Sequence, residues 1–346
     1  MAEFEEARSG NDDWIPGRVT AQYSHQYRVV TAFGDRSAEV SGRYQFQAAT
    51  PGDYPAVGDW VAVKPIDSEA RAIIHALLPR RSAMIRKAAG PALHEQVIGA
   101  NIDTLLIVCA LNDDFNIRKI ERYLIAAWES GAQPVVLLTK ADLCEEVALR
   151  VAAVEAAAPG VAVHAVSALQ GNGMDSLAAY VTPGATIAVT GSSGVGKSTL
   201  LNNLAGDDLQ RVQGIREDDA RGRHTTTHRE LFALPGGGIM MDTPGMRELG
   251  LWEAADGLHE AFSDIETLAA QCRFRDCKHE SEAGCAVLAA IEAGELEGKR
   301  LGSYHKTSRE LARHARKEQS ASQRLKKTAA KRTSHVRARG YAQIEE

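Results

Sequence analysis

The chain has 346 residues and a formal net charge of −5, with 44% hydrophobic and 5% aromatic residues, the composition of an ordinary globular protein. This length allows two or three domains, each with its own core. No apolar run approaches the ~20 residues of a membrane span, and no basic-then-apolar segment opens the chain. We therefore expect a cytoplasmic protein with no membrane contact. The mild net charge neither indicates nor excludes a nucleic-acid partner.

Residues 1–13 are predicted to be an acidic N-terminal extension, and residues 14–85 to be a β-domain. The β-domain contains short β-prone runs that are separated by Gly, Pro and Asp turn signals. These runs are Arg18–Ala21, Tyr27–Thr31, Ala38–Val40 and Asp59–Val63. About five short strands favour a small closed barrel of the OB-fold type, although any small β-domain would show this pattern.

Residues 95–252 alternate between strands and helices. Thr104–Ala110 is a continuous apolar run, as expected for a strand buried on both faces. Helices are expected at Ile117–Ser130, Glu145–Ala157 and Met174–Tyr180. Further strands are expected at Pro134–Leu138, Val161–Val166, Ala185–Thr190, Leu231–Leu234 and Gly238–Met241. This alternation predicts an α/β domain with a mostly parallel sheet and right-handed crossovers.

The remaining chain is predicted to form a helical domain over residues 253–310 and a basic tail over residues 311–346. The tail carries many Lys and Arg residues and few large apolar ones. Two interpretations stay open: the tail binds RNA phosphates, or it is a solvated, partly disordered end.

A phosphate-binding loop follows the strand that ends at Thr190. The sequence GSSGVGKST fits G-x-x-x-x-G-K-[ST] between a strand and a helix start. Its residues are Gly191, Ser192, Ser193, Gly194, Val195, Gly196, Lys197, Ser198 and Thr199. The glycines allow successive N–H groups to face phosphates. Lys197 would neutralise the β- and γ-phosphates, and the Ser198 hydroxyl would hold Mg²⁺.

Two later segments supply candidate switch residues. In Asp242-Thr243-Pro244-Gly245, Asp242 at a strand end can hold Mg²⁺ through water, and Gly245 can offer its N–H to the γ-phosphate. Residues 222–228 read GRHTTTH, and one of Thr225, Thr226 and Thr227 would complete the Mg²⁺ shell, with Thr226 favoured.

The catalytic water lacks an obvious partner, because Met246 follows the glycine where some GTPases carry Gln. Our hypothesis is that His224 positions this water. Lys197 and Thr226 are the other candidate catalytic residues. The missing Gln also predicts slow intrinsic turnover that a partner would increase.

The candidate base-reading motif, Thr139-Lys140-Ala141-Asp142, precedes the phosphate loop, whereas in ordinary GTPases it follows the loop. The Lys140 stem would pack on guanine, and the Asp142 carboxylate would accept hydrogen bonds from the base N1–H and amino group. Thr139 stands where Asn is usual. Ser167 and Ala168, which follow another strand, would lie behind the guanine base and support it.

Three cysteines and one histidine lie within a short segment. Cys272, Cys277, His279 and Cys285 supply the soft S/N ligands of a closed tetrahedral structural zinc site, although buried thiols beside a surface histidine are an alternative. Cys109 and Cys144 are expected on apolar strand or helix faces as inert core residues.

The motif order TKAD, SA, GSSGVGKST, GRHTTTH, DTPG and CRFRDCKHESEAGC resembles the RsgA (YjeQ) family of circularly permuted GTPases. The resemblance implies an OB-fold, a permuted GTPase domain and a zinc domain that contact ribosomal RNA. It also implies GTP hydrolysis that the small ribosomal subunit stimulates during late subunit maturation. GTP or GDP, Mg²⁺ and one Zn²⁺ are the expected cofactors. The expected partners are the small subunit and its rRNA, and we expect a monomer.

One alternative comes from a different class of protein, a non-catalytic RNA-binding assembly chaperone that uses GTP as a structural ligand. The presence of Lys197, Ser198 and Asp242 together favours the enzyme, because these residues complete the Mg²⁺ and phosphate set.

Overall fold

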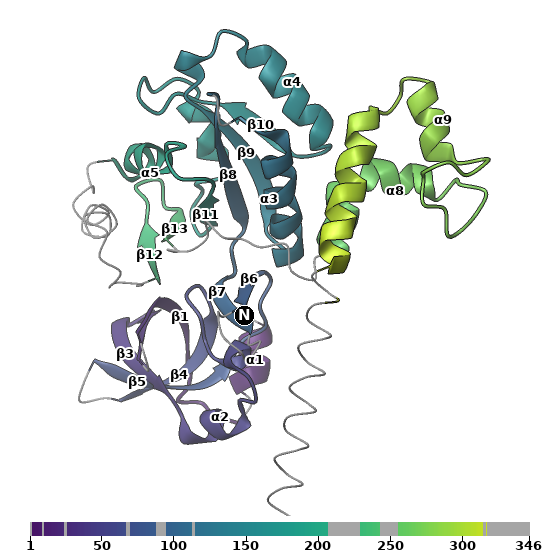
Figure 1. The fold of residues 1–346 in the computed structure, drawn as a ribbon. Helices are drawn as coiled ribbons and strands as arrows, with labels where there is room; N and C mark the ends of the chain where they lie inside the picture. The colour runs from purple at the N-terminus through teal and green to yellow at the C-terminus, as the bar shows by residue number, and fades with distance from the viewer. Residues whose placement is uncertain are drawn as a thin grey trace, which may run out of the picture. The chain divides into compact units, whose positions relative to one another are not determined.

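The computed structural model is shown in Figure 1. It describes residues 2–8, 10–23, 26–66, 70–87, 95–112, 115–206, 229–242, 255–313 and 316. The chain divides into two compact units. The first comprises Met1–Gly250 with His259–Ser263, and the second comprises Leu251–Leu258 with Asp264–Glu346.

The N-terminal part of the first unit is a closed five-stranded barrel. Its strands are β1 (Ile15–Gln22), β2 (Tyr27–Thr31), β3 (Gly34–Val40), β4 (Trp60–Ile66) and β5 (Arg71–Leu77). They follow the order β1-β2-β3-β5-β4, β4 closes on β1, and only β3 and β5 pair in parallel. Helix α2 (Gly42–Gln47) connects β3 to β4. The predicted OB-fold barrel is therefore confirmed.

Alternating residues of these strands fill the barrel, with Val19, Val29, Val61 and Ile74 among the fully buried side chains. The acidic extension contains helix α1 (Ala2–Arg8), which begins with exposed Glu side chains and buries a single aromatic residue. That residue, Phe4, packs with Ala62 and Leu78 in a small cluster of its own. The N-terminal segment is therefore anchored to the barrel by apolar burial.

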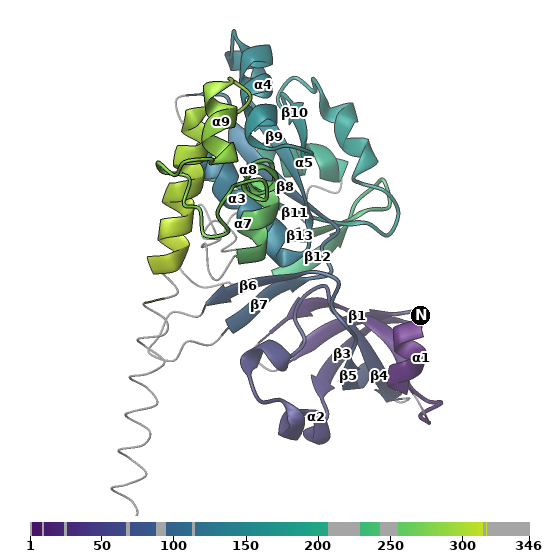
Figure 2. The ribbon, with the colours of Figure 1, turned by 90° about the vertical axis from the view of Figure 1, so that its right-hand side faces the viewer.

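The second part of the first unit is a doubly wound α/β domain (Figure 2). Its strands are β8 (Thr104–Ala110), β9 (Gln133–Thr139), β10 (Ala162–Ala165), β11 (Thr186–Thr190), β12 (Arg229–Ala233) and β13 (Ile239–Asp242). They follow the order β10-β9-β8-β11-β13-β12, and all pairs are parallel except β12–β13. All seven residues of β8 are buried, which confirms the strand expected from its apolar run.

Helices cover both faces of this sheet, with α5 on the opposite side from α3 (Figure 1). They are α3 (Ile117–Ser130), α4 (Val147–Ala157) and α5 (Lys197–Ala205). Asn116 caps α3 by accepting a hydrogen bond from the Arg118 N–H, and Gly131 ends the helix in the left-handed conformation. The predicted helix at Met174–Tyr180 is a 3₁₀ segment, η3 (Met174–Ala179).

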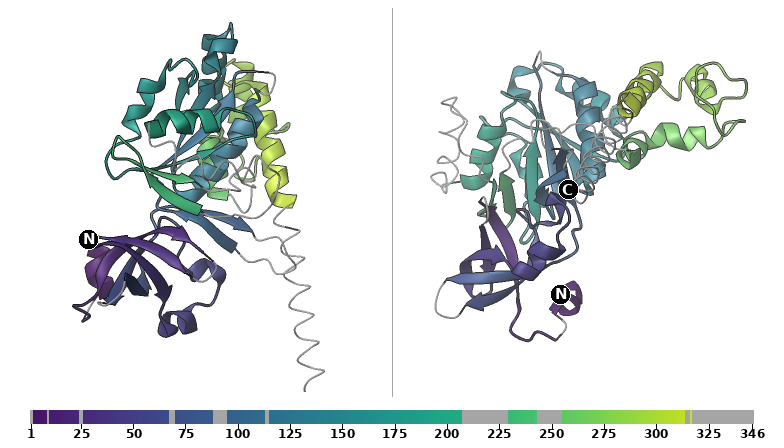
Figure 3. Two further views of the ribbon diagram at one scale, coloured as in Figure 1. Left: turned by 90° about the vertical axis from the view of Figure 1, so that its left-hand side faces the viewer. Right: turned by 60° about the horizontal axis from the view of Figure 1, so that its bottom comes forward.

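The barrel and the α/β domain share one eleven-stranded sheet, because β1 pairs antiparallel with β12 (Figure 3). A buried arginine, Arg18 on β1, joins the same two parts. Its guanidinium donates to the Thr186 hydroxyl over 2.7 Å and to the Gly58 and Asn101 carbonyls over 3.3 Å each. Burial lowers the pKa of Arg18, and the three acceptors take three of its five N–H donors.

A two-stranded hairpin that the sequence analysis did not predict leads from the barrel to β8. It consists of β6 (Ala83–Lys87) and β7 (Glu95–Ala100), which pair antiparallel. Gly58 has φ +95°, and a Cβ there would collide with the Ala100 carbonyl. Only glycine allows the barrel backbone to approach β7 so closely.

The described part of the second unit is mainly helical, as predicted, apart from a loop at residues 270–285. The named helices after β13 are α7 (Ala255–Ala261), α8 (Ser263–Ala269) and α9 (Ala286–Glu292), and residues 298–313 are helical as well. Arg300, which is almost fully buried, makes a bidentate ion pair with Asp264 over 3.0 Å. No helix within the described ranges is long and apolar enough to cross a membrane.

Candidate functional site

Four of the predicted nucleotide-site motifs lie at one edge of the sheet. Strands β9, β10, β11 and β13 run in parallel, so their carboxyl ends meet at the same edge. Thr139 ends β9, Ser167 follows β10, Gly191 follows β11 and Asp242 ends β13. The carboxyl edge of an open α/β sheet is where ligands bind in such folds. The permuted order of the motifs therefore still assembles one site.

The phosphate loop has the backbone geometry that its sequence predicts. Gly191, Gly194 and Gly196 all have positive φ, and a Cβ on Gly191 would collide with the Val108 carbonyl. Val195 is buried in the domain core, which anchors the middle of the loop. Helix α5 begins at Lys197 directly after the loop, so its N-terminus faces the space where phosphates would bind.

Lys197 is held over the loop by the backbone. Its ammonium donates to the Gly191 carbonyl over 2.7 Å and to the Ser192 carbonyl over 2.5 Å. These bonds orient the charge before any ligand binds, which lowers the cost of organising the site. Ser198 and Thr199 are exposed on the first turn of α5. The residues of the loop thus fit a nucleoside triphosphate with Mg²⁺.

Thr139 connects the candidate base-reading strand to the phosphate loop. Its hydroxyl donates to the Val195 carbonyl over 2.6 Å, and the side chain is 2% exposed. Lys140 follows in the left-handed conformation with φ 58°, which is uncommon for a residue other than glycine and turns the chain at the end of β9. Asp142 lies exposed in the 3₁₀ segment η2 (Ala141–Leu143).

The segment after β10 is fixed beside this motif. The Ala141 N–H donates to the Val166 carbonyl over 3.2 Å, and the Ser167 N–H donates to the Asn172 carbonyl over 2.9 Å. Ser167 is buried, and its hydroxyl oxygen accepts a hydrogen bond from the Gln170 N–H. The structure therefore brings Ala141 next to the Ser167 and Ala168 segment, as the sequence predicted for the two base-side motifs.

One contact in this region was missed by the sequence analysis. The side-chain amide of Asn203, on α5, donates to the Ala168 carbonyl over 2.5 Å. It links the helix after the phosphate loop to the segment expected behind the base. An Asn on an exposed helix face has no sequence signal that distinguishes it from an ordinary surface residue.

Part of the predicted switch machinery lies outside the described residues. These positions are His224, Thr225, Thr226, Thr227, Gly245 and Met246. Asp242 is described through its backbone, which pairs with Glu230 of β12. The assignments of catalytic and Mg²⁺-binding roles to these residues therefore stay predictions.

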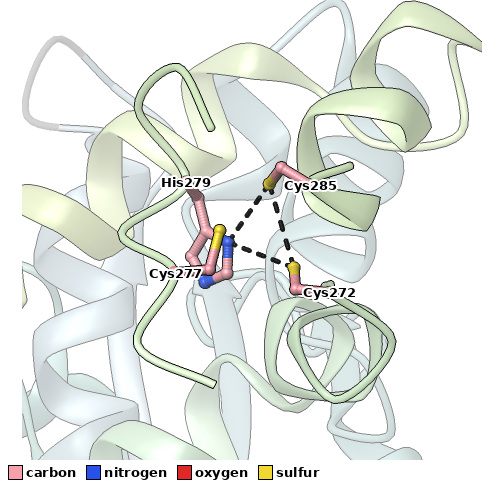
Figure 4. A group of neighbouring side chains, drawn as sticks. All are labelled: Cys272, Cys277, His279 and Cys285. Carbon is pink, nitrogen blue, oxygen red and sulfur yellow. Dashed lines mark hydrogen bonds between the residues drawn. The ribbon is translucent and has the colours of Figure 1, made fainter. Parts of the chain in front are cut away.

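The four candidate zinc ligands converge in the second unit (Figure 4). One ligand atom from each of Cys272, Cys277, His279 and Cys285 can be chosen so that all four lie within 4.8 Å of one another. The Cys272 and Cys285 sulfurs are 3.9 Å apart, and the His279 Nδ1 lies 3.6 Å and 3.3 Å from them. Zn–S and Zn–N bonds in a tetrahedral site would separate two sulfurs by about 3.8 Å and a sulfur from a nitrogen by about 3.6 Å. The donor set therefore fits a zinc ion.

The protonation of this cluster also favours a cation. Burial disfavours a charged Cys272, but the backbone N–H groups of Ala286 and Val287 outweigh it and lower the pKa of this thiol. Burial and the neighbouring thiols raise the pKa of Cys277, because a second negative charge beside the first is unfavourable. A bound divalent cation would remove this conflict and stabilise all three thiolates.

A further residue of the metal loop was not singled out from the sequence. The Glu282 carboxylate accepts hydrogen bonds from the N–H groups of Lys278, Glu280 and Ser281 over 2.9–3.0 Å. These bonds lower the pKa of Glu282 to about 2. The carboxylate thereby organises the loop around His279, a role that depends on a local turn rather than on a recognisable motif.

The remaining cysteines differ in their surroundings. Cys109 is buried at the end of β8, as expected for a core residue. Cys144 was expected on an apolar strand or helix face in the core, and this expectation was wrong. The residue follows η2 in irregular backbone and is only half-buried. The short segment after the base-reading motif does not continue into a helix until Val147.

The sheet edge, the phosphate loop and the order of the motifs define a circularly permuted GTPase that carries an OB-fold barrel and a cysteine-rich segment compatible with zinc. A family model described as RsgA GTPase matches residues 77–252. The chain belongs to the RsgA GTPase family, and its activity is the hydrolysis of GTP. This family implies GTP or GDP and Mg²⁺ as ligands.

Close relatives are found along most of the chain. A "Small ribosomal subunit biogenesis GTPase RsgA 2" of Lactiplantibacillus plantarum is 47% identical over 86% of this chain and 84% of the relative. A "Small ribosomal subunit biogenesis GTPase RsgA" of Opitutus terrae is 45% identical over 89% of this chain and 86% of the relative.

Two solved structures share the fold. YjeQ from Thermotoga maritima aligns with a TM-score of 0.67 and 26% identity over 86% of this chain and 99% of that chain. YloQ, described as a circularly permuted GTPase, aligns with a TM-score of 0.63 and 25% identity over 88% of this chain and 96% of that chain. The predicted permuted order is thus confirmed.

A second family model, described as 50S ribosome-binding GTPase, matches residues 186–320. Its description names the large ribosomal subunit, whereas the relatives above are named for the small one. The match includes the phosphate loop but not Thr139–Asp142, which lies before it in this permuted chain. The relatives described above match this chain over both motifs, so we base the proposed choice of subunit on them.

Proposed function

We propose that this GTPase binds the small ribosomal subunit through its rRNA and assists or checks late maturation of that subunit. In this proposal, the subunit stimulates GTP hydrolysis. The observation that carries the proposal is the joining of the nucleotide site to an OB-fold barrel in one sheet, in a chain whose relatives are named for small-subunit biogenesis. OB-fold barrels commonly bind single-stranded or irregular nucleic acid.

The proposed nucleotide contacts follow the geometry of the sheet edge. Lys140 and Asp142 read guanine, and Thr139 supports them by holding the phosphate loop. Ser167 and Ala168 back the base. The backbone of Gly191–Thr199 binds the phosphates, with Lys197 on the β- and γ-phosphates. Asp242 ends β13 and Gly245 comes three residues later, so the Asp242 carboxylate and the Gly245 N–H are proposed to contact Mg²⁺ and the γ-phosphate.

Mg²⁺, when bound, supplies charge stabilisation at the β- and γ-phosphates. Ser198, Thr226 and Asp242 are the proposed residues that hold it. His224 is proposed to orient the attacking water. The zinc ligands are Cys272, Cys277, His279 and Cys285, whose spacing fits one tetrahedral ion. We further propose a cytoplasmic location and a monomer.

The surface of the barrel supports an RNA partner. Phe33, in the turn between β2 and β3, is 71% exposed, and Phe46, in α2, is 92% exposed. Exposed aromatic rings on a barrel of this kind offer stacking surfaces for unpaired bases. In the second unit, the Arg273 guanidinium lies 5.5 Å from the centre of the half-exposed Phe274 ring, a pairing of charge and ring that also suits RNA.

The test is GTP turnover by the full chain with purified small subunits, with purified large subunits as the matched control. We expect stimulation by small subunits only, and loss of turnover in Lys197→Met. If small subunits bind but leave turnover unchanged, and RNA affinity is equal with GTP, GDP and no nucleotide, the chaperone alternative replaces this proposal. Stimulation by large subunits alone would assign the partner to the other subunit.

A further inference from the structure

A row of paired residues connects the strand that carries Asp242 to the barrel. Asp242 of β13 is opposite Glu230 of β12, and Glu230 is opposite Ala21 of β1. Ala21 is in turn opposite Arg28 of β2. Neighbouring strands lie about 4.8 Å apart, so the barrel strand β1 is only about 10 Å from the proposed Mg²⁺ residue.

Side chains reinforce this row on one face. The Arg28 guanidinium pairs with the Glu230 carboxylate over 3.0 Å, although β1 lies between their strands. The intervening residue is Ala21, which is 1% exposed and whose methyl group leaves room for Arg28 to reach past it. Directly paired residues of neighbouring strands point to the same side of a sheet, so a larger residue at this position would block the contact.

The backbone of β1 is shaped for this connection. Its register with β2 shifts between Val19 and Ala21, as a β-bulge does. A bulge bends and twists its strand. Here it lies where the second neighbour of β1 changes from β4 to β12, while β2 stays paired on the other side. Three residues earlier in β1, Arg18 holds the start of β11 through the Thr186 hydroxyl. The strand is therefore fixed at both ends of its contact with the GTPase sheet.

We propose that Arg28 and Glu230 are positioning residues of the GTPase site, which keep β12 in register so that Asp242 is held in place for Mg²⁺. The inference rests on the proposed role of Asp242. It also gives the barrel a route to the nucleotide site: a ligand that moves the β1–β2 hairpin, or competes for the half-exposed Arg28, would act on β12 and β13. An RNA phosphate has the charge to make that competition.

The experiment compares Arg28→Glu, Glu230→Arg and the double exchange. The first readout is amide hydrogen exchange at residues 229–233 in protein without nucleotide or Mg²⁺. The second is the Mg²⁺ concentration that half-saturates basal GTP turnover. Arg43→Glu is the control, because Arg43 is exposed on α2 and its substitution makes the same charge change on the barrel.

We expect each single charge reversal to speed amide hydrogen exchange in β12 and to raise the Mg²⁺ concentration for half-saturation, each by about threefold or more. The reason is that two like charges then face each other across Ala21. The double variant, in which the two charges are swapped, should return the hydrogen-exchange rate and the Mg²⁺ requirement to within about twofold of the parent, because it restores an ion pair. Affinity for GDP without Mg²⁺ should not change, because the base and phosphate contacts lie elsewhere.

Two outcomes would overturn the inference. One is a parental hydrogen-exchange rate and Mg²⁺ requirement in the single variants, and the other is no recovery of these values in the double variant. Asp242→Asn separates this failure from that of the proposed function. If Asp242→Asn raises the Mg²⁺ requirement while Arg28→Glu does not, only the coupling is wrong. If Asp242→Asn has no effect, the assigned role of Asp242 is wrong, and the inference fails with it.

Discussion

The hydroxyl of Thr139 donates to the Val195 carbonyl over 2.6 Å and so joins two segments of the nucleotide site that lie 56 residues apart in the chain. Thr139 closes β9, and Val195 lies inside the phosphate loop. Thr139 stands where this motif usually has Asn. The structure shows that the shorter side chain still reaches the loop.

Thr139→Val should weaken GDP and GTP binding together, because it removes the hydroxyl and leaves a buried carbonyl without its donor. A loss of about 1–2 kcal/mol, or about five- to thirtyfold in affinity, is expected. Thr139→Asn should retain most of the affinity. Fluorescent-nucleotide titration measures this, with Thr31→Val as the control, since the Thr31 hydroxyl makes an exposed bond to the Gly34 carbonyl. Equal losses in both Thr→Val variants would contradict a specific role.

Asp142→Asn should move base preference from GTP toward XTP. The Asp142 carboxylate is exposed at the sheet edge, where it can accept hydrogen bonds from the guanine N1–H and amino group. Hydrogen bonds to charged groups contribute about 1.5–3 kcal/mol each, so GTP affinity should fall by about a hundredfold or more. Competition binding with both nucleotides measures the change, and Asp175→Asn in η3 is the control. A similar loss for GTP and XTP would show that Asp142 does not read the base.

Local patterns were sufficient to predict much of this site. The phosphate loop needs a strand, several glycines and a helix start in sequence, and all three are adjacent along the chain. The helix at Ile117–Ser130 has its cap and its glycine stop beside it, and the predicted bounds are those observed. The zinc ligands lie within 14 residues, so their spacing alone indicated a cluster.

Contacts between distant segments were not predictable in the same way. Ala21 and Glu230 are paired across the two parts of the first unit. The residue pattern of each strand is nevertheless the same as that of a strand that pairs only within its own domain. In the sequence, Arg18 is an ordinary polar residue of a strand. Its burial is favourable only because Thr186 lies where its hydroxyl can accept a hydrogen bond from the guanidinium. Such pairings depend on how two complete folds meet, which leaves no periodic signal in either sequence.

Removal of zinc should disrupt the second unit and leave nucleotide binding intact. All four ligands belong to that unit, and the free energy of metal binding to such sites contributes directly to folding. We expect one equivalent of zinc in the purified protein. Cys277→Ser should reduce the zinc content strongly, whereas Cys144→Ser, outside the cluster, should not. Metal analysis and GDP titration measure both effects, and full zinc occupancy in Cys277→Ser would exclude this thiol as a ligand.

Glu282→Gln should weaken zinc binding by about tenfold, as loss of supporting contacts around metal ligands does. Folding lowers the pKa of Glu282 to about 2, so its contribution is fully present above the ordinary pKa of a Glu and is lost as the pH falls toward about 2. The effect of the substitution should therefore be constant at neutral pH. Competition with a chromophoric chelator measures the affinity, with Glu295→Gln as the control; parental affinity in Glu282→Gln would show that the loop is ordered without this carboxylate.

Arg18→Met should loosen the barrel from the GTPase domain. The substitution keeps an unbranched, flexible side chain but removes the guanidinium, and so leaves the Thr186 hydroxyl and the carbonyls of Gly58 and Asn101 without a buried donor. Loss of about 3 kcal/mol in unfolding free energy is expected, against about 1 kcal/mol for Thr186→Val, which removes one acceptor. Urea unfolding followed by fluorescence measures both variants and their combination. Because Thr186 is one of the partners of Arg18, the double variant should lose less than the sum of the single losses. Strictly additive losses would mean that the two side chains stabilise the fold independently, and that this bond does not join the barrel to β11.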